Sequence, residues 1–354
     1  MWGMSRRGGF RRVTIVVALA ALMVLAVCVP AGAAQAAKRH AKHTAPVQAF
    51  VLTSSPDSLL DLKAHAHSIG VVYPTYFNCQ IPSGQLLGEG VPAVDAYAHA
   101  RHIKVMPRFN CQDGATVHEI LTNPQLRAST LAQLAGLARN PMYGGLCLDL
   151  ENDGAADREA LTSFVTAAAS AMHALHKKLA VVVDGVASEN TALSTGFYDD
   201  RALGVVADTV FVLAWGTHWA GSQPGPIAPL AYVSAVARYV ASLPNASRFV
   251  LGAAMYGLDW AGQGGRGDEA AAYQYSQAVT LARSVGARPV RDPESGELTF
   301  SYTSAEGVVH HVWYMDARSV EDIVRIARGS HLAVGLWRLG SEDQALWGSS
   351  AVVG

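Results

Sequence analysis

The chain has few charged residues, and they are balanced. Only 16% of its 354 residues are Asp, Glu, Lys or Arg, with 27 basic and 28 acidic side chains. Without a basic excess or a nucleic-acid-binding motif, no nucleic acid partner is expected. No glycine-rich phosphate loop follows the first strand-like segment, which argues against a nucleotide-binding sheet. Half of the residues are hydrophobic, so a large packed core is expected.

Residues 1–36 have the pattern of a secretory signal peptide. Four arginines precede an apolar run at residues 13–29, and two A-x-A cleavage sites follow it. The run is almost long enough to cross a bilayer, so an uncleaved N-terminal membrane anchor is the alternative. We therefore expect a secreted, extracytoplasmic protein of the cell envelope, with residues 37–47 as a basic tether and residues 48–350 as the folded domain.

Three cysteines follow the signal segment, and an odd number leaves at least one thiol free. Cys79 and Cys111 lie in similar Phe-Asn-Cys-Gln stretches, each after an apolar strand-like run, residues 71–77 and 103–109. Neighbouring parallel strands would bring these two cysteines side by side, so a disulfide between them is expected. Cys147 would then be the buried free thiol.

Strand-like and helix-like segments alternate through the rest of the chain. Eight strands that are apolar throughout and separated by helices indicate a parallel sheet covered on both faces. Eight repeats in about 300 residues favour a closed (β/α)8 TIM barrel over an open sheet. A turn and a short extra strand at residues 312–314 indicate a small insertion between strand 7 and strand 8. The eight expected strands are residues 48–52, 71–77, 103–109, 143–152, 179–183, 208–215, 248–256 and 332–337.

The fourth expected strand, residues 143–152, carries two carboxylates. In an extended strand its leucines would point one way, and Cys147, Asp149 and Glu151 the other. Ionisable groups in such an apolar strand are costly unless they are paired or have a function. One interpretation is a catalytic acid whose proton affinity is tuned by its neighbour. The other is a buried ion pair with Arg or Lys of an adjacent strand.

In a (β/α)8 barrel the active site lies at the carboxyl ends of the strands. Two carboxylates surrounded by aromatic side chains there indicate sugar chemistry, because sugar rings offer apolar faces for stacking. The polar or aromatic residues at the expected strand ends are Tyr76, Arg108, Asp149, Glu151, Asp184, Trp215, Tyr256 and Trp337.

The stretch from Gly145 to Glu151 resembles the fourth-strand signature DxxDxDxE of glycoside hydrolase family 18. Further stretches resemble the branch of this family that contains spore cortex-lytic enzymes, and they follow in the family's order. The resemblance runs from about residue 48 to Trp347. Its other motifs are residues 222–226, 251–260, 292–296, 312–319 and 335–340.

This resemblance implies substrate-assisted catalysis, an exception to the two-carboxylate scheme of most glycosidases. Glu151 would be the general acid and base, and Asp149 would orient the substrate's own N-acetyl group as nucleophile. The proximity of Asp149 would raise the proton affinity of Glu151. Trp337 would form the floor of the subsite and Tyr256 would line it. The substrate would be an N-acetylated polysaccharide, chitin oligomers or peptidoglycan, cleaved by a monomer without a cofactor.

The sequence departs from the family pattern in the site. Cys147 replaces an acid beside Asp149, and Trp215-Gly216 replaces a Tyr-Asp pair on the sixth strand. In the family, the Tyr hydroxyl hydrogen-bonds the attacking acetamide. The indole N–H of Trp215 is also a hydrogen-bond donor, but it sits on a larger ring and so at a different distance from the backbone. Tyr76, Trp215, Asp184 and His218 are expected around the substrate, the last two as partial replacements.

The replacement by Trp215 leaves a second function open, a glycan-binding barrel that has lost efficient turnover. Survival of both carboxylates favours the enzyme. A metal site is not expected, because the paired histidines have no carboxylate at matching spacing.

Overall fold

The computed structural model describes residues 45–151, 154–191, 196–265 and 269–353. The expected signal peptide and residues 37–44 of the expected tether lie outside these residues. The described residues belong to one compact unit. None of its helices is both long and apolar enough to cross a membrane.

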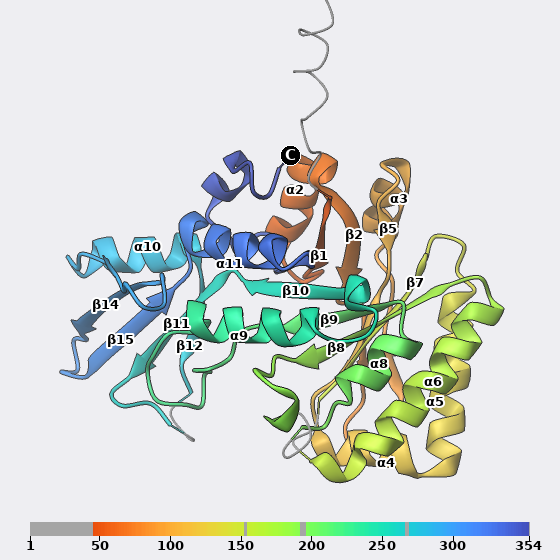
Figure 1. The fold of residues 1–354 in the computed structure, drawn as a ribbon. Coiled ribbons are helices and arrows are strands. Elements are labelled where there is room, and N and C mark those ends of the chain that lie inside the picture. The colour runs from red at the N-terminus through yellow and green to blue at the C-terminus, as the bar shows by residue number, and fades with distance from the viewer. Residues whose placement is uncertain (1–44, 152–153, 192–195, 266–268, 354) are drawn as a thin grey trace, which may run out of the picture. The chain divides into compact units, whose positions relative to one another are not determined.

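Eight parallel strand positions form a barrel, which confirms the expected fold (Figure 1). β1 pairs with β16 on one side and with β2 on the other, so the first and last strands are neighbours. Two positions are each split in two, because prolines interrupt the backbone ladder at Pro74 and Pro107. β2 and β5 pair below the breaks, and β3 and β6 pair above them. The strands are β1 (Val47–Val51), β2 (Ile69–Pro74) with β3 (Phe77–Cys79), β5 (Lys104–Val105) with β6 (Arg108–Cys111), β7 (Gly145–Leu150), β8 (Lys178–Asp184), β9 (Thr209–Leu213), β10 (Phe249–Ala254) and β16 (Ala333–Trp337).

Helices cover the outside of the barrel. The expected break at Asn123-Pro124 is confirmed: Asn123 ends one helix and caps the next, accepting hydrogen bonds from the amides of Gln125 and Leu126. A short helix before β9, α8, was not predicted. The helices are α2 (Pro56–His65), α3 (Pro92–Ala100), α4 (Gly114–Thr122), α5 (Pro124–Ala138), α6 (Arg158–Ala174), α8 (Asp200–Val206), α9 (Leu230–Ala241) and α11 (Ala317–Gly329).

An insertion follows strand position seven, as expected, but it is larger than the sequence indicated. It is a five-stranded antiparallel sheet in the order β12-β11-β15-β14-β13, packed against helix α10 (Figure 1, left). The helix expected at residues 268–285 begins only at Tyr275, because residues 271–274 pair with β11 as a strand. The elements are β11 (Tyr256–Ala261), β12 (Ala271–Gln274), α10 (Tyr275–Ser284), β13 (Val290–Arg291), β14 (Leu298–Thr303) and β15 (Val309–Tyr314).

The barrel interior is a separate apolar cluster of eight buried residues, among them Phe50, Cys147 and Phe211. The leucines of β7 instead belong to the larger cluster beneath the helices, so β7 has the two faces that its sequence predicts. Two glycines make room for the Phe211 ring. A Cβ atom on Gly252 or Gly335 would lie 2.6 or 2.1 Å from it, well inside van der Waals contact.

Candidate active site

β7 brings the two expected carboxylates to the carboxyl end of the barrel. The Asp149 side chain points into the barrel and is almost completely buried, whereas Glu151 follows the last residue of the strand and is partly exposed. The two carboxylates therefore lie two residues apart, one buried inside the barrel and the other partly exposed at its mouth.

Both carboxylates line one cavity of about 330 Å³. Most of its lining residues are aromatic or aliphatic and four carry polar or charged side chains, as in sites that orient a small ligand. The lining residues are Phe50, Arg108, Gln112, Asp149, Glu151, Val182, Leu213, Trp215, Gly216, Trp219, Tyr256 and Trp337.

Arg108 pairs with Asp149 at the bottom of this cavity. Arg108 Nη1 donates to Asp149 Oδ2 at 2.8 Å, and both side chains are largely buried. The guanidinium also lies over the ring of Trp337, with 5.3 Å from its carbon to the ring centroid. The ion pair of the second sequence interpretation is therefore present, and Asp149 and Glu151 also line a cavity, so the catalytic interpretation stays a prediction.

The other carboxylate oxygen, Asp149 Oδ1, is buried without a hydrogen-bond partner in the described part of the chain. Buried polar atoms are nearly always paired, so such an atom is a place for a ligand donor or a proton. Burial raises the pKa of Asp149 to about 7; Arg108 opposes the shift, while Glu151 and Asp184 add to it. Asp149 therefore changes charge near neutral pH.

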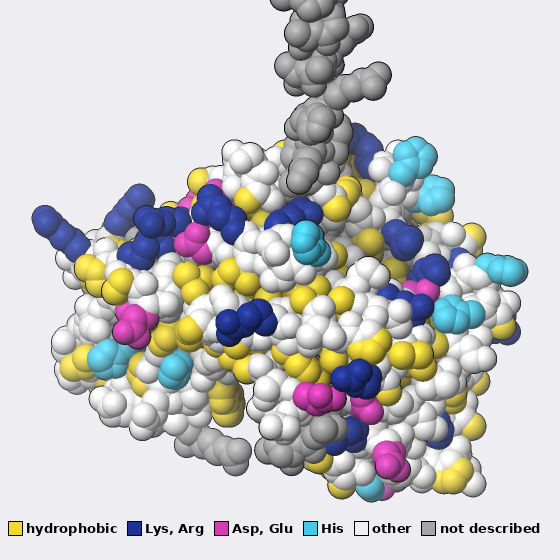
Figure 2. All heavy atoms as spheres, in the orientation of Figure 1, with side chains coloured by type: hydrophobic (Ala, Val, Ile, Leu, Met, Phe, Trp, Pro, Cys, Tyr) yellow, Lys and Arg dark blue, Asp and Glu magenta, His cyan; other side chains and the backbone are white. Residues whose placement is uncertain are grey.

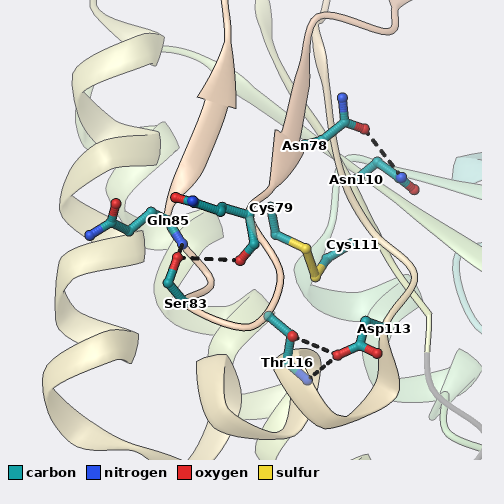
Figure 3. The surroundings of a disulfide bond; sticks show 9 residues. Asn78, Cys79, Ser83, Gln85, Asn110, Cys111, Asp113 and Thr116 are labelled. Atoms are coloured by element: carbon teal, nitrogen blue, oxygen red, sulfur yellow. Dashed lines mark hydrogen bonds between the residues drawn. A yellow bond between two sulfur atoms is a disulfide. The ribbon is translucent and has the colours of Figure 1, made fainter.

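Glu151 is held from the neighbouring strand. Gln112 Nε2 donates to Glu151 Oε1 at 2.7 Å, and the Glu151 amide donates to the Cys111 carbonyl at 2.9 Å. Cys111 forms a disulfide with Cys79 in the structure, with the Cα atoms 5.2 Å apart, and Cys147 is the buried free cysteine (Figure 3). Asn78 and Asn110, which precede these cysteines, are also hydrogen-bonded. The disulfide therefore fixes the backbone that carries Gln112.

An aromatic wall follows β9. Trp215 packs against both main hydrophobic clusters, and Gly252 leaves it space, because a Cβ atom there would lie 2.7 Å from its ring. Gly216 has a φ of +87°, a backbone conformation that glycine adopts readily. Trp219, 49% exposed, completes the wall at the rim.

Tyr256 and Trp337 line this cavity, and they also line a second hollow of about 520 Å³ on the insertion side. The edge of Phe50 packs against Trp337, with ring centroids 4.9 Å apart. The peptide bond from Trp337 to Arg338 is cis.

Three residues expected around the substrate lie elsewhere. Tyr76 is buried beneath α3 and donates to Asp95 Oδ1 at 2.7 Å, because a turn after Pro74 breaks the alternation of the strand. His218 donates from Nδ1 to the Pro226 carbonyl at 2.7 Å within its own loop. Asp184 is exposed at the end of β8; its charge reaches Asp149, but it does not line the cavity.

The sequence interpretation gave no role to several residues that line the cavity, among them Arg108, Gln112 and Trp219. Arg108 stands at an expected strand end, but the register that pairs it with Asp149 is set by the barrel. Gln112 and Trp219 lie in loops, where no periodicity indicates direction. Among the described residues, no group of three or more His, Cys, Asp or Glu side chains could hold a metal ion.

Comparisons with known proteins agree with this geometry. The model of the family described as glycosyl hydrolases family 18 matches residues 47–342. The cortical fragment-lytic enzyme of Bacillus subtilis is 26% identical over 238 residues, which cover 64% of this chain and 54% of that protein. A chitinase from Chromobacterium violaceum has a similar structure, with a TM-score of 0.76, 26% identity, and coverage of 87% of this chain and 98% of that chain.

The spore cortex-lytic enzyme SleL of Bacillus megaterium shares the fold. It is 20% identical, with a TM-score of 0.74 and coverage of 86% of this chain and 72% of that chain. Among the curated relatives, the chain spans about half the length of the cortical fragment-lytic enzyme and of the Bacillus subtilis glycosylase YdhD.

Proposed function

We propose that this chain, which belongs to the glycosyl hydrolases family 18, is a glycosidase that cleaves β-1,4 bonds of N-acetylated glycans. Its substrate would be peptidoglycan or chitin oligomers, and Glu151 would be the general acid and base. The resemblance to a cortical fragment-lytic enzyme and to a chitinase supports both substrates.

One observation carries the proposal. Asp149 has one oxygen held by Arg108 and the other buried and unpaired, and the residue lines a cavity that Glu151 also lines. An acetamide N–H of a bound sugar would satisfy that oxygen. Such a bond would hold the acetamide beneath the sugar, where its carbonyl oxygen can reach the anomeric carbon.

Glu151 would then donate its proton to the glycosidic oxygen as the bond from this oxygen to the anomeric carbon breaks. The acetamide oxygen bonds to that carbon, which gives an oxazolinium ion that the Asp149 carboxylate stabilises. Water attacks the same carbon and gives its proton to Glu151. Two displacements at one carbon retain the anomeric configuration.

Aromatic residues would shape this subsite. Trp337 would form the floor beneath the sugar, Tyr256 its side, and Trp215 would supply the indole N–H in place of the family's Tyr hydroxyl. Trp215 is also the observation that favours the second candidate, a glycan-binding barrel with little turnover, because its donor sits on a larger ring.

We further propose that residues 1–36 direct export, and that the protein acts in the cell envelope as a monomer. The alternative within this proposal is an uncleaved segment that tethers the domain to a membrane.

The test is release of reducing ends from purified peptidoglycan and from chitooligosaccharides. Wild type is expected to release them, and Glu151→Gln to abolish release by at least about 100-fold while glycan binding persists. Glu119→Gln, which changes an exposed carboxylate on α4, is the matched control and keeps full activity. If wild type binds glycan but releases no reducing ends, the second candidate remains. A gain of activity in Trp215→Tyr would then show that Trp215 is the cause of the low turnover.

A further inference from the structure

The second hollow adjoins the proposed catalytic cavity, because Tyr256 and Trp337 line both. It lies between the end of β16 and the first turn of α10. Among the described residues that line it, Arg338 is the only charged one, whereas the catalytic cavity contains two carboxylates. The hollow is lined by Tyr256, Ala272, Tyr273, Gln274, Gln277, Trp337, Arg338 and Ser341.

The Arg338 guanidinium makes no hydrogen bond and no ion pair with any described residue. Its Nη1 is fully buried and unpaired. Burial lowers the pKa of Arg338, but an arginine remains charged at neutral pH. A half-buried cation without a partner is costly, and it is the arrangement expected where a ligand brings the counter-charge.

The acids nearest to Arg338 leave it unpaired. Glu342 raises the pKa of Arg338 but forms no ion pair with it. Burial and Asp61 raise the pKa of Glu342 itself to about 9, so it is uncharged at neutral pH. Glu342 also accepts a hydrogen bond from Trp347 Nε1 at 2.8 Å. Asp57 on α2 is exposed and raises the pKa of Arg338 without an ion pair to it.

The backbone around Arg338 is fixed, so the cation has a defined place. The Leu339 amide donates to the Phe50 carbonyl at 3.1 Å, and the Gly340 amide donates to Asp61 Oδ2 at 2.7 Å. On the opposite wall, Gln277 Oε1 accepts from the Gln274 amide at 2.8 Å, which leaves the Gln277 amide nitrogen as a donor.

We propose that this hollow is a carboxylate subsite of the glycan cleft, in which Arg338 pairs with a carboxylate on a sugar next to the one held at Asp149. This inference rests on the proposed function and extends it. Chitin has no carboxylate, whereas peptidoglycan has two sources, the lactyl group of muramic acid and the stem peptide. Arg338 would thus favour peptidoglycan strands over chitin.

The test compares wild type with Arg338→Gln on three glycans of equal length. These are chitotetraose, a peptide-free tetrasaccharide of alternating N-acetylglucosamine and N-acetylmuramic acid, and the same tetrasaccharide with its stem peptides. The control is Arg283→Gln, which removes a cation from the exposed last turn of α10 and keeps wild-type rates. Figure 2 shows Lys and Arg side chains gathered over this side of the molecule, so a control for general charge is needed.

Arg338→Gln is expected to lower kcat/KM on the peptide-free acidic glycan by about 10- to 100-fold, mainly through KM, with chitotetraose unchanged. A loss confined to the peptide-bearing glycan would assign the carboxylate to the stem peptide. Equal effects on acidic and neutral glycans, or none, would overturn the subsite. If wild type cleaves none of the three, the proposed function fails, and calorimetric binding of the acidic glycan to wild type and Arg338→Gln still decides the subsite.

Discussion

The family resemblance predicts an acidic residue beside Asp149, but in this chain the charged neighbour of Asp149 is the cation Arg108. In this chain the position before Asp149 on the inner face of β7 is Cys147, whose thiol is fully buried and has its pKa raised by burial and by Asp149. A neutral thiol cannot share a proton with Asp149. Arg108, from the neighbouring strand, instead holds one carboxylate oxygen and leaves the other for substrate.

Replacing Arg108 by Met should change the pH dependence of the reaction. Arg108 lowers the pKa of Asp149, so its removal raises that pKa above its value of about 7. If ionised Asp149 is required, the acid limb of kcat/KM moves to higher pH by about one unit or more, with little activity left at neutral pH. The measurement is a pH profile of kcat/KM on a soluble oligosaccharide.

Arg108→Lys is the control for this experiment, since it keeps the charge and loses the planar fork. It should have its acid limb between those of wild type and Arg108→Met. An unchanged limb in Arg108→Met, with the variant folded, would show that Asp149 does not set the profile.

Among the elements, the insertion holds the loop after β9. Glu297, directly before β14, is completely buried, and its two oxygens accept from the amides of Ile227 at 2.9 Å and Ala228 at 2.7 Å. The Ile227 carbonyl in turn accepts from the Gly216 amide at 2.9 Å. A connected path of hydrogen bonds therefore joins the insertion to the backbone next to Trp215.

Glu297→Ala should loosen this connection. Two buried amides would lose a charged acceptor, which should lower the free energy of unfolding by about 3 kcal/mol. The wall formed by Trp215 would lose its support, so KM should rise in the protein that remains folded. Urea unfolding and steady-state kinetics measure the two effects.

Glu294→Ala, at an exposed position of the same turn, is the matched control and should stay within about 0.5 kcal/mol of wild type. Equal stability of the two variants would contradict the role given to Glu297.

Gly252 in β10 offers a test of the barrel interior. An added Cβ atom would lie 2.6 Å from the Phe211 ring, 2.7 Å from the Trp215 ring and 2.8 Å from the Val212 carbonyl oxygen. Gly252→Ala should therefore destabilise the fold by about 1–3 kcal/mol and reduce activity by moving Trp215.

Gly136→Ala in α5 is the opposite case, because nothing lies within 4 Å of its added Cβ atom. It should stabilise the protein by about 0.5–1 kcal/mol through helix propensity. Thermal unfolding of both variants measures the two effects. An unchanged melting temperature in Gly252→Ala would mean that the barrel interior shifts to accommodate the added methyl group.

The barrel strands could be predicted because each is a continuous apolar run, and the two faces of β7 follow from alternation alone. Tyr76 could not be placed, because the prediction extends one strand through Pro74, where the backbone turns. The insertion was underestimated because its strands, such as residues 271–274, are short and partly exposed. The partner of Asp149 depends on strand register, which no local pattern in β6 encodes.

At the scale of the whole molecule, several buried carboxyl groups lose their protons at a higher pH than carboxyl groups in water do. Burial raises the pKa values of Asp149, Asp200 and Glu297 to about 7 and that of Glu342 to about 9. Each group holds its proton more tightly in the folded protein than in the unfolded chain. Between the ordinary pKa and the raised one the folded state therefore binds more protons, and stability falls as pH rises.

This sign predicts that the melting temperature decreases from about pH 5 to pH 7 and continues to decrease toward pH 9, where Glu342 ionises. The total change should be on the order of 5 °C or more for a domain of this size. Carboxylates with lowered pKa values, such as Asp208 and Asp316, act in the opposite direction but below about pH 4, outside this range. Calorimetry across pH 5–9.5 measures the curve.

Glu342→Gln isolates the last part of that curve, because an amide resembles the protonated carboxyl group and cannot ionise. The variant should match wild type near pH 6, exceed its melting temperature at pH 9, and lose the decrease between pH 7 and pH 9. Glu119→Gln should keep the wild-type curve. If Glu342→Gln keeps the wild-type decrease between pH 7 and pH 9, Glu342 does not titrate in this range, and the argument that it is uncharged beside Arg338 fails.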